Sequence, residues 1–380
     1  MISKHFRINQ TEELACKVLN GSIKDVPATE SFFMFAIANQ VAATAGHIIK
    51  NSKEKFSEIE QKFIGEHTKV QNYLGHYLDE LDQLAYLLMQ SGIRVVALKN
   101  AGIARGIYDC YGCCPMGDVD LLVSRKDFLT AHTILLNNNY NFKYRSILEK
   151  ENIQNAIKSG GAEYYKELKT GEKLWLELQF RSVAGRWICH EQEPEATGLL
   201  ERSVKISGTE VRILSPEDNL LQVALHTAKH SFVRAPGFRL HTDVDRIVRY
   251  QKVDWDLFVE NVIKLKVKTA VYISLLIPCE LLGTPIPDVV LNTLSPMKIK
   301  TWLVCIIINK AGLFNPEEKK FSKITYILFN ILLYDSYKLI FKNIFPNKEK
   351  MMDMYNCKIF LIPFFYLKRF LDLLLIRQKT

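Results

Sequence analysis

The sequence lacks the features that mark several other classes of protein. No apolar stretch reaches the roughly 20 residues that a bilayer span requires, since the longest run near the C-terminus covers only residues 324–334. No apolar secretory segment follows the N-terminal residues MISKHFRINQTEEL, and there is no internal repeat or low-complexity linker. The 48% hydrophobic and 24% charged fractions exclude a disordered or fibrous chain. We therefore expect a globular protein in a reducing, cytoplasmic compartment.

Cysteines at the spacing of a zinc site are missing as well. The chain has eight cysteines, and the segment CYGCC, with Cys110, Cys113 and Cys114, looks like a metal knuckle. However, no second cysteine pair and no nearby set of Cys and His stands at zinc spacing. The sequence therefore favours ordinary loop and core cysteines over a structural zinc ion.

A dense stripe of positive charge is also missing, although the chain is basic overall. Fifty Lys and Arg stand against 41 Asp and Glu, and residues 342–380 hold eight basic and three acidic residues. This moderate excess of positive charge would help the chain to bind a nucleoside triphosphate. It is not the dense Lys and Arg stripe of a nucleic-acid-binding protein, so nucleic acid is possible as a partner but not favoured. We expect residues 358–380 to form a helix buried against the preceding helices, and a peripheral membrane contact through the C-terminus is the alternative.

At 380 residues the chain is long enough for more than one core. Residues 10–90, including SFFMFAIANQVAATAG, carry helical spacing of apolar residues that stops at Gly92. The compact runs IRVVALK and GDVDLLVS and the alternating run KLWLELQF are typical of strands, and a helix cap at Ser215 restores the helical period. We predict an α+β protein in three parts: an N-terminal helical region (1–92), a core with a small mixed sheet (93–214) and a C-terminal helical region (215–380).

Two aspartates stand two positions apart in the segment GDVDLLV. Residues i and i+2 of a strand point the same way, so Asp118 and Asp120 present two carboxylates side by side. Mg²⁺ prefers oxygen ligands and commonly takes one or two carboxylates plus substrate phosphates. Glu177, on the polar face of KLWLELQF, is the candidate third ligand, and a solvated position on an edge strand is its alternative.

The strand before this pair ends in a turn that suits phosphate. VVALK runs into NAGIARGIY, where the backbone amides of Asn100, Ala101 and Gly102 could hold phosphate at a helix N-terminus. Lys99 at the strand end would add a positive charge, although taken alone it could equally be a lysine in solvent. The turn, the paired aspartates and the third acidic strand together indicate a site for a metal and a nucleotide.

The segments ALKNAGIARGIYD and CPMGDVDLLVSRKDFLTAHTILLNNNY resemble the signature of an uncharacterised bacterial nucleotidyltransferase family in the polymerase-beta-type superfamily. PMGDVDLLV is the most specific part. The segments SFFMFAIANQVAATAG, LLQVALHTAKHS, LHTDVDRIVRYQKVDWDLF and FPNKEKMMDMYN are also similar to the family, so the likeness covers most of the chain. It implies a nucleotidyltransferase core flanked by the two helical regions.

The resemblance also implies an enzyme that uses Mg²⁺ or Mn²⁺. It would transfer a nucleoside monophosphate from a nucleoside triphosphate to a hydroxyl acceptor and release pyrophosphate. Asp118, Asp120 and Glu177 would be the catalytic metal ligands, and Lys99 would open the nucleotide loop. The sequence does not identify the acceptor, which is either a small molecule or a protein.

Three positions depart from the family pattern. Asn100 stands where the family usually has Gly, Cys114 where it usually has Arg, and Gln179 where a His often follows the third acidic residue. Asn tolerates left-handed backbone angles, but Cys does not replace a guanidinium as a partner for phosphate. These departures support an alternative function, a catalytically weak or inactive protein that binds nucleotides or serves as a scaffold.

A pair of histidines, His226 and His230, stands four residues apart in a predicted helix, with Lys229 between them. No third ligand stands at H-E-x-x-H spacing, so helix packing is favoured over a role in the substrate cleft, and metal binding is the least favoured. We expect Asp243 to fix the neighbouring helices by hydrogen bonding rather than to act in catalysis.

Overall fold

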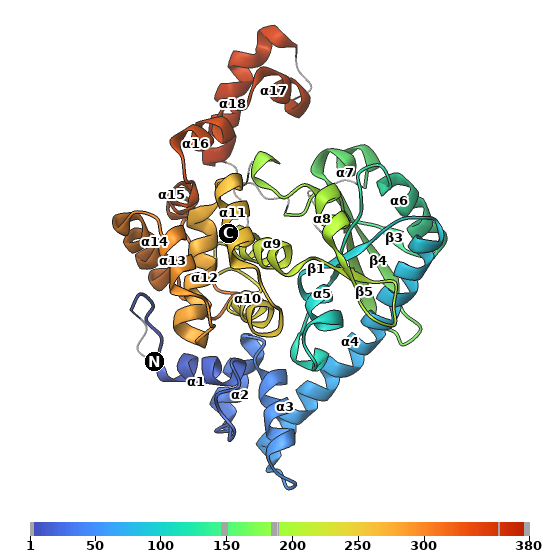
Figure 1. The fold of residues 1–380 in the computed structure, drawn as a ribbon, viewed down its shortest axis with the longest axis vertical. Coiled ribbons are helices and arrows are strands. Elements are labelled where there is room, and N and C mark those ends of the chain that lie inside the picture. Colours follow the sequence, from blue (N-terminus) through green and yellow to red (C-terminus); the bar gives the residue numbers. More distant parts are fainter. Residues whose placement is uncertain (1–3, 146–150, 184–187, 189, 356–357, 376–380) are drawn as a thin grey trace.

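The computed structural model describes residues 4–145, 151–183, 188, 190–355 and 358–375. In this part of the chain, helices surround a seven-stranded mixed sheet, so the protein is α+β as predicted. Figure 1 shows the sheet with the long helix α4 along one side and the helices from α9 onward on the other. The division into three domains stays a prediction.

Four helices precede the sheet. Their bounds are α1 (Gln10–Leu19), α2 (Glu30–Ala38), α3 (Ala42–Ser52) and α4 (Glu58–Gln90). The apolar spacing predicted one helix throughout SFFMFAIANQVAATAG. The structure instead has two helices, because the helix is interrupted between α2 and α3, where Gln40 has a φ of 58°. Gly46 then lets α3 approach α4 closely, because a Cβ on this residue would lie 2.0 Å from the carbonyl oxygen of Phe63.

The central sheet has the strand order β3-β4-β5-β2-β1-β7-β6. Its strands are β1 (Val96–Leu98), β2 (Val119–Leu122), β3 (Asn141–Phe142), β4 (Gly161–Glu167), β5 (Lys173–Gln179), β6 (Val204–Lys205) and β7 (Arg212–Ile213). The helical segments between them are α5 (Lys99–Gly106), η1 (Tyr111–Cys113), α6 (Phe128–Asn137), α7 (Ile153–Ser159), η2 (His190–Gln192) and α8 (Ala196–Arg202). Strand β2 runs antiparallel to β1 and parallel to β5, which places it in the middle of the sheet.

Helices make up the rest of the described chain. They are α9 (Pro216–Lys229), α10 (Arg239–Tyr250), α11 (Trp255–Leu265), α12 (Lys268–Leu282), α13 (Asp288–Leu294), α14 (Lys298–Ala311), α15 (Lys323–Leu333), α16 (Tyr337–Ile344), α17 (Lys348–Tyr355), η3 (Ile359–Leu361) and α18 (Ile362–Leu375). The predicted cap holds, since the Ser215 side chain accepts a hydrogen bond from the backbone N–H of Asp218. Helices α9 and α10 pack against α5 and so lie beside the turn that follows β1.

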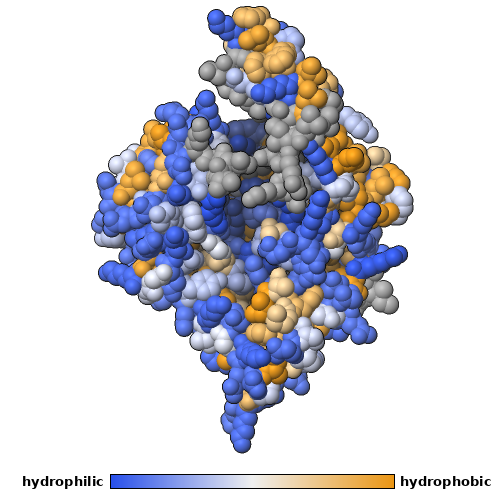
Figure 2. Space-filling view, turned by 180° about the vertical axis from the view of Figure 1, so that it is seen from behind, coloured by the Kyte–Doolittle hydropathy of each residue, from blue (hydrophilic) through white to orange (hydrophobic). Residues whose placement is uncertain are grey.

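The last helices, α16 to α18, project from the body of the molecule (Figure 1). Phe360, Phe364 and Leu367 are 71%, 62% and 58% exposed, so the expected burial of this segment against the preceding helices is wrong for these side chains. Arg369 instead bonds to the carbonyl oxygens at the end of α16. Figure 2 shows hydrophobic residues on the projecting part and a hollow lined by hydrophilic residues below it.

Within the described residues, no single helix is long and apolar enough to cross a membrane. One bent pair, Asp288–Leu294 with Lys298–Ala311, meets that test only when its two helices are taken together, and they meet at an angle of 100°.

Candidate active site

The register of the sheet places three carboxylates in one row. Asp120 on β2 pairs with Glu177 on β5, and Glu177 pairs with Glu163 on β4. Residues paired across neighbouring strands carry their side chains on the same face of the sheet. Asp118 precedes β2, and its charge acts on Asp120. Asp118, Asp120 and Glu177, which the sequence predicted as metal ligands, therefore belong to one cluster together with Glu163.

Lys99 is the cation buried in this cluster. Its Nζ donates to Asp120 Oδ1 at 2.6 Å and lies 3.8 Å from Glu177 Oε2. The side chain of Lys99 is only 8% exposed, which excludes the alternative of a lysine in solvent. Its backbone has a φ of 53°, a left-handed conformation that costs a non-glycine residue free energy and persists only where the surroundings fix it.

The predicted phosphate loop forms the first turn of α5. Asn100 and Ala101 are 7% and 1% exposed, and Gly102 is also buried. A Cβ on Gly102 would lie 2.6 Å from the carbonyl oxygen of Ala97, so the close return of the chain onto β1 requires glycine. The role of these amides in holding phosphate stays a prediction.

The pKa values of the cluster follow from burial and from its crowded charges. Burial raises the pKa of Asp120 well above its usual value, and the charges of Asp118 and Glu177 raise it further against the effect of Lys99. Burial also opposes the ionisation of Glu177, but Lys99 and Lys229 outweigh it and hold the pKa of Glu177 at about 2. Burial acts to lower the pKa of Lys99, but the charges of the surrounding carboxylates have the larger effect, so the pKa of Lys99 is raised. The cluster therefore combines repelling carboxylates with cations that only partly offset them.

Arg145 and Glu163 belong to the cluster, and sequence reasoning missed both. The Arg145 guanidinium donates to Asp118 and lies 3.5 Å from Glu163 Oε2, while the Arg145 backbone N–H donates to the same oxygen at 2.7 Å. The guanidinium carbon also lies 5.3 Å from the centre of the Trp175 ring. The acidic position in the strand GAEYYKE was the available signal for Glu163. Nothing in the local sequence marked Arg145.

Helix α9 contributes His226 and Lys229 near the cluster, and its C-cap residue is His230. Burial lowers the pKa of Lys229, and the charge of Lys99 lowers it further. Burial and the nearby lysines also lower the pKa of both histidines, to about 3 for His230, so both rings are neutral at pH 7. The ring centroids of the two histidines lie 4.6 Å apart. The Lys229 side chain therefore adds positive charge beside Glu177, whereas the histidines offer only neutral hydrogen-bonding groups.

Helix α10 forms hydrogen bonds to both segments that lead into the cluster, the start of α5 and the turn around η1. Arg239 donates to the Asn100 side chain, and Arg246 donates to the carbonyl oxygen of Cys113 at 2.6 Å. The buried carboxylate of Asp243 lies between the two guanidinium groups, at 3.9 Å from Arg239 and 3.8 Å from Arg246. Both guanidinium groups belong to α10 itself, and Asp243 Oδ1 has no hydrogen-bond partner among the described residues, so the expected hydrogen bonding of Asp243 to neighbouring helices stays a prediction. Cys114 is fully buried beside these groups, so guanidinium groups are present near the position where Arg is usual.

The donor chemistry of the cluster fits a divalent cation. It consists of carboxylate oxygens, the ligands that Mg²⁺ and Mn²⁺ prefer. The side chains of Asp118 and Glu177 are 28% and 27% exposed, so a ligand can approach from solvent, while Asp120 is 5% exposed. A cation beside Asp120 would relieve the repulsion that raises its pKa.

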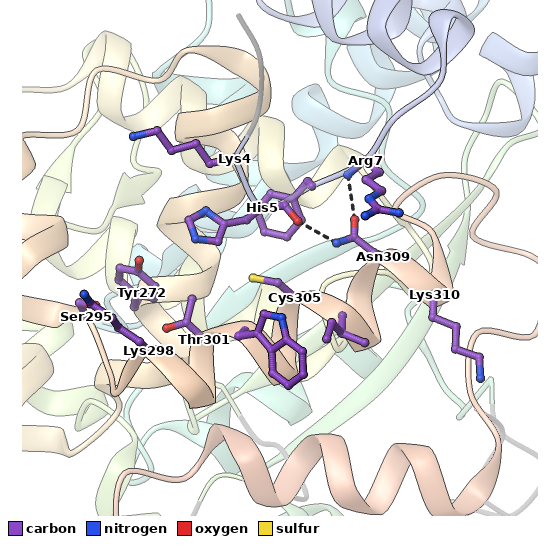
Figure 3. Close-up of a pocket in the computed structure, with 13 residues that line it drawn as sticks. Lys4, His5, Arg7, Tyr272, Ser295, Lys298, Thr301, Cys305, Asn309 and Lys310 are labelled. Atoms are coloured by element: carbon purple, nitrogen blue, oxygen red, sulfur yellow. Dashed lines mark hydrogen bonds between the residues drawn. The ribbon is translucent and has the colours of Figure 1, made fainter.

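A separate pocket lies between the N-terminal segment and helices α12 and α14 (Figure 3). Its volume is about 910 Å³, and its lining includes His5, Tyr272 and Trp302. Asn309 fixes the N-terminal segment there by donating to the carbonyl oxygen of His5 and accepting from the N–H of Arg7. None of the residues lining this pocket belongs to the carboxylate cluster.

The comparisons with known proteins point to one family. Residues 28–283 match a family model described as "uncharacterised nucleotidyltransferase". The matched segment includes every residue of the carboxylate cluster as well as helices α9 and α10. Searches among curated proteins and among solved structures gave no match.

Proposed function

The chain belongs to the family of uncharacterised nucleotidyltransferases, and on this premise we propose that it transfers a nucleoside monophosphate from a nucleoside triphosphate to a hydroxyl acceptor. The observation that carries this proposal is the row of carboxylates on neighbouring strands, with Asp120 in register with Glu177 and with Lys99 buried beside both. Such a row gives oxygen ligands for a divalent cation beside a fixed positive charge for phosphate.

In the proposed reaction, the acceptor oxygen attacks the α-phosphorus of the nucleotide. The bond from that phosphorus to the bridging oxygen breaks, and pyrophosphate leaves with the electron pair, while the acceptor proton passes to solvent. Mg²⁺ or Mn²⁺, held by Asp118, Asp120 and Glu177, would neutralise phosphate charge and favour the deprotonated acceptor. Glu177, whose pKa of about 2 keeps it ionised, accepts a hydrogen bond from the acceptor hydroxyl.

The cations around the row serve the triphosphate in this proposal. Lys99 is fixed by Asp120, and Lys229 and Arg145 lie close enough to lower the pKa of Glu177. Arg145 pairs with Asp118 here, and a cation on Asp118 would release the guanidinium for a phosphate oxygen. The amides of Asn100, Ala101 and Gly102 would hold a further phosphate oxygen at the start of α5.

The test is an incubation with each of the four nucleoside triphosphates, labelled at either the α- or the γ-phosphate, with Mg²⁺ or Mn²⁺ and a cell extract as the source of acceptors. Nucleotidyl transfer places the α-label, and not the γ-label, on a small molecule, a protein or the chain itself. Metal-dependent binding without any transfer of label would favour the alternative of an inactive nucleotide-binding protein, which the departures at Asn100, Cys114 and Gln179 support.

A contact with a membrane surface is a second proposal, and it concerns the projecting helices. The exposed side chains of Phe360, Phe364 and Leu367 are accompanied by Lys368 and Arg369. Apolar groups with flanking basic residues suit the surface of an anionic bilayer. Sedimentation with anionic and with neutral liposomes tests this contact. We expect the chain to sediment with the anionic liposomes, and a chain that stays in the supernatant with them would contradict the proposal.

A further inference from the structure

Four potential metal ligands from three separate segments meet at the loop that precedes Asp118. They are His47 on α3, His67 on α4, and Cys110 and Cys113 at the two ends of the turn around η1. One donor atom from each residue lies within 4.8 Å of all the others. We call this group the Cys2His2 cluster. It shares no residue with the carboxylate cluster.

The distances within the Cys2His2 cluster come close to those of a tetrahedral zinc site. Zinc binds thiolate sulfur at about 2.3 Å and imidazole nitrogen at about 2.0 to 2.1 Å, so the ligand atoms of a tetrahedral site lie about 3.4 to 3.8 Å apart. Cys110 Sγ lies 3.4 Å from Cys113 Sγ, 3.4 Å from His47 Nδ1 and 4.0 Å from His67 Nε2. The other pairs of donor atoms lie within 4.8 Å of each other, so the four side chains would have to move closer together around a bound ion.

Two glycines allow the segments to meet. Gly46 precedes His47 and permits the close contact of α3 with α4, since a Cβ there would overlap the backbone of Phe63. Gly112 stands between the two cysteines, and a Cβ there would lie 2.7 Å from Cε1 of the His67 ring. The loop therefore lies directly against His67 because position 112 carries no side chain.

The surroundings of the two imidazoles also suit ligation. His67 is 2% exposed, and its Nε2, the nitrogen that faces the cluster, contacts the Cys110 thiol at the limit of a hydrogen bond. Its other nitrogen, Nδ1, has no hydrogen-bond partner in the described chain. A buried polar ring with so few partners is unfavourable unless another group binds it. The outer nitrogen of His47, Nε2, lies 3.2 Å from the Asn51 side-chain amide, where a metal-binding histidine commonly has a partner.

We propose that His47, His67, Cys110 and Cys113 bind one structural Zn²⁺. Four protein ligands close the coordination sphere, which distinguishes a structural site from a catalytic one. As the ion binds, the two thiols release their protons to solvent and become thiolates. The ion would join α3 and α4 to the turn at residues 110–113, and so would fix the loop that enters β2 at Asp118. This proposal does not depend on the proposed nucleotidyl transfer.

The test is the zinc content of the full-length protein, purified under reducing conditions without a metal-affinity tag and measured by plasma mass spectrometry. We expect one zinc ion per chain, and we expect His47→Gln and Cys110→Ser to lose it. His76→Gln, on the same helix as His67, and Cys279→Ser, on α12, are matched controls that keep it. The variant Asp118→Asn with Asp120→Asn also keeps it, which separates this site from the carboxylate cluster.

A second measurement covers the case in which a substituted chain fails to fold. The unsubstituted protein, reconstituted with Co²⁺, should show a thiolate-to-cobalt charge-transfer band and the intense visible bands of tetrahedral cobalt. The absence of these bands would overturn the proposal. It would also be overturned by zinc retained in His47→Gln, by a zinc-free protein after growth with added zinc, or by thiol titration that finds Cys110 and Cys113 joined in a disulfide.

Discussion

Replacing Lys99 by Met removes the charge at the centre of the carboxylate cluster and keeps most of the aliphatic stem. The Nζ of Lys99 lies 2.6 Å from Asp120 Oδ1, and the two side chains are only 8% and 5% exposed. Removing one partner of a buried ion pair leaves the other charge without compensation, which typically costs about 3 to 5 kcal/mol. We expect Lys99→Met to lower the free energy of unfolding by an amount in this range at pH 7.

The matched control is Lys62→Met, which removes a lysine that pairs with Glu30 at 3.0 Å on the surface. Both of these side chains are largely exposed, at 42% and 63%, so solvent screens the pair and the change should be small. Denaturation in urea, followed by tryptophan fluorescence, compares the two variants with the unsubstituted chain. Equal midpoints for Lys99→Met and Lys62→Met would refute the assignment of Lys99 as the compensating charge.

The dependence on pH gives a second check of the same variant. The pKa of Asp120 is raised in the folded state above its ordinary 3.8, so protonation of Asp120 favours the folded state and this contribution is lost as the pH rises. Without Lys99 the pKa of Asp120 rises further. The deficit of Lys99→Met should therefore be largest at neutral pH and should shrink as the pH falls toward 4. A deficit that grows on acidification would contradict this account.

Four further predictions concern other parts of the molecule. Arg145→Met should strengthen metal binding, because Asp118 loses its guanidinium partner, and should weaken nucleotide binding about tenfold, both measured by calorimetry. Gly102→Ala should lower the melting temperature, because its Cβ would lie 2.6 Å from a backbone oxygen, whereas Gly65→Ala, whose Cβ meets nothing within 4 Å, should not lower it. His230→Asn should leave the pH dependence of nucleotide binding unchanged between about pH 6 and 8, because the ring with a pKa of about 3 is already neutral there. Deleting residues 358–380 should leave the melting temperature nearly unchanged and abolish liposome binding, because η3 and α18, the described part of this segment, project from the body; a large fall in the melting temperature would show that the segment supports the core.

The sequence predicted the parts of the structure that depend on local patterns. The alternation of KLWLELQF correctly places Leu174, Leu176 and Leu178 in the core, with Glu177 on the half-buried face. The cap at Ser215 marks the start of α9. Such features follow from side-chain period and backbone hydrogen bonding, which a single segment contains.

The parts that sequence reasoning missed depend on contacts between distant segments. His47 and His67 stand far from Cys110 in the sequence, and no motif spacing connects them, yet the close packing of α3 on α4 brings all three together. The register that aligns Glu163 with Glu177 likewise becomes visible only once the strand pairing is known. The exposure of side chains on the C-terminal helices was also missed. Densely spaced apolar residues indicate burial, but whether another part of the chain covers them cannot be read from the segment itself.

The most direct test of the proposed site is calorimetric titration of a magnesium complex of a non-hydrolysable nucleoside triphosphate into the chain and into the variant Asp118→Asn with Asp120→Asn. The amide side chains keep the volume of the carboxylates and remove the charges that would hold the cation. We predict that the unsubstituted chain binds the complex only when the metal is present, and that the variant retains its circular dichroism spectrum but loses this binding. Unchanged affinity in a folded variant would contradict the account and would place the nucleotide site elsewhere.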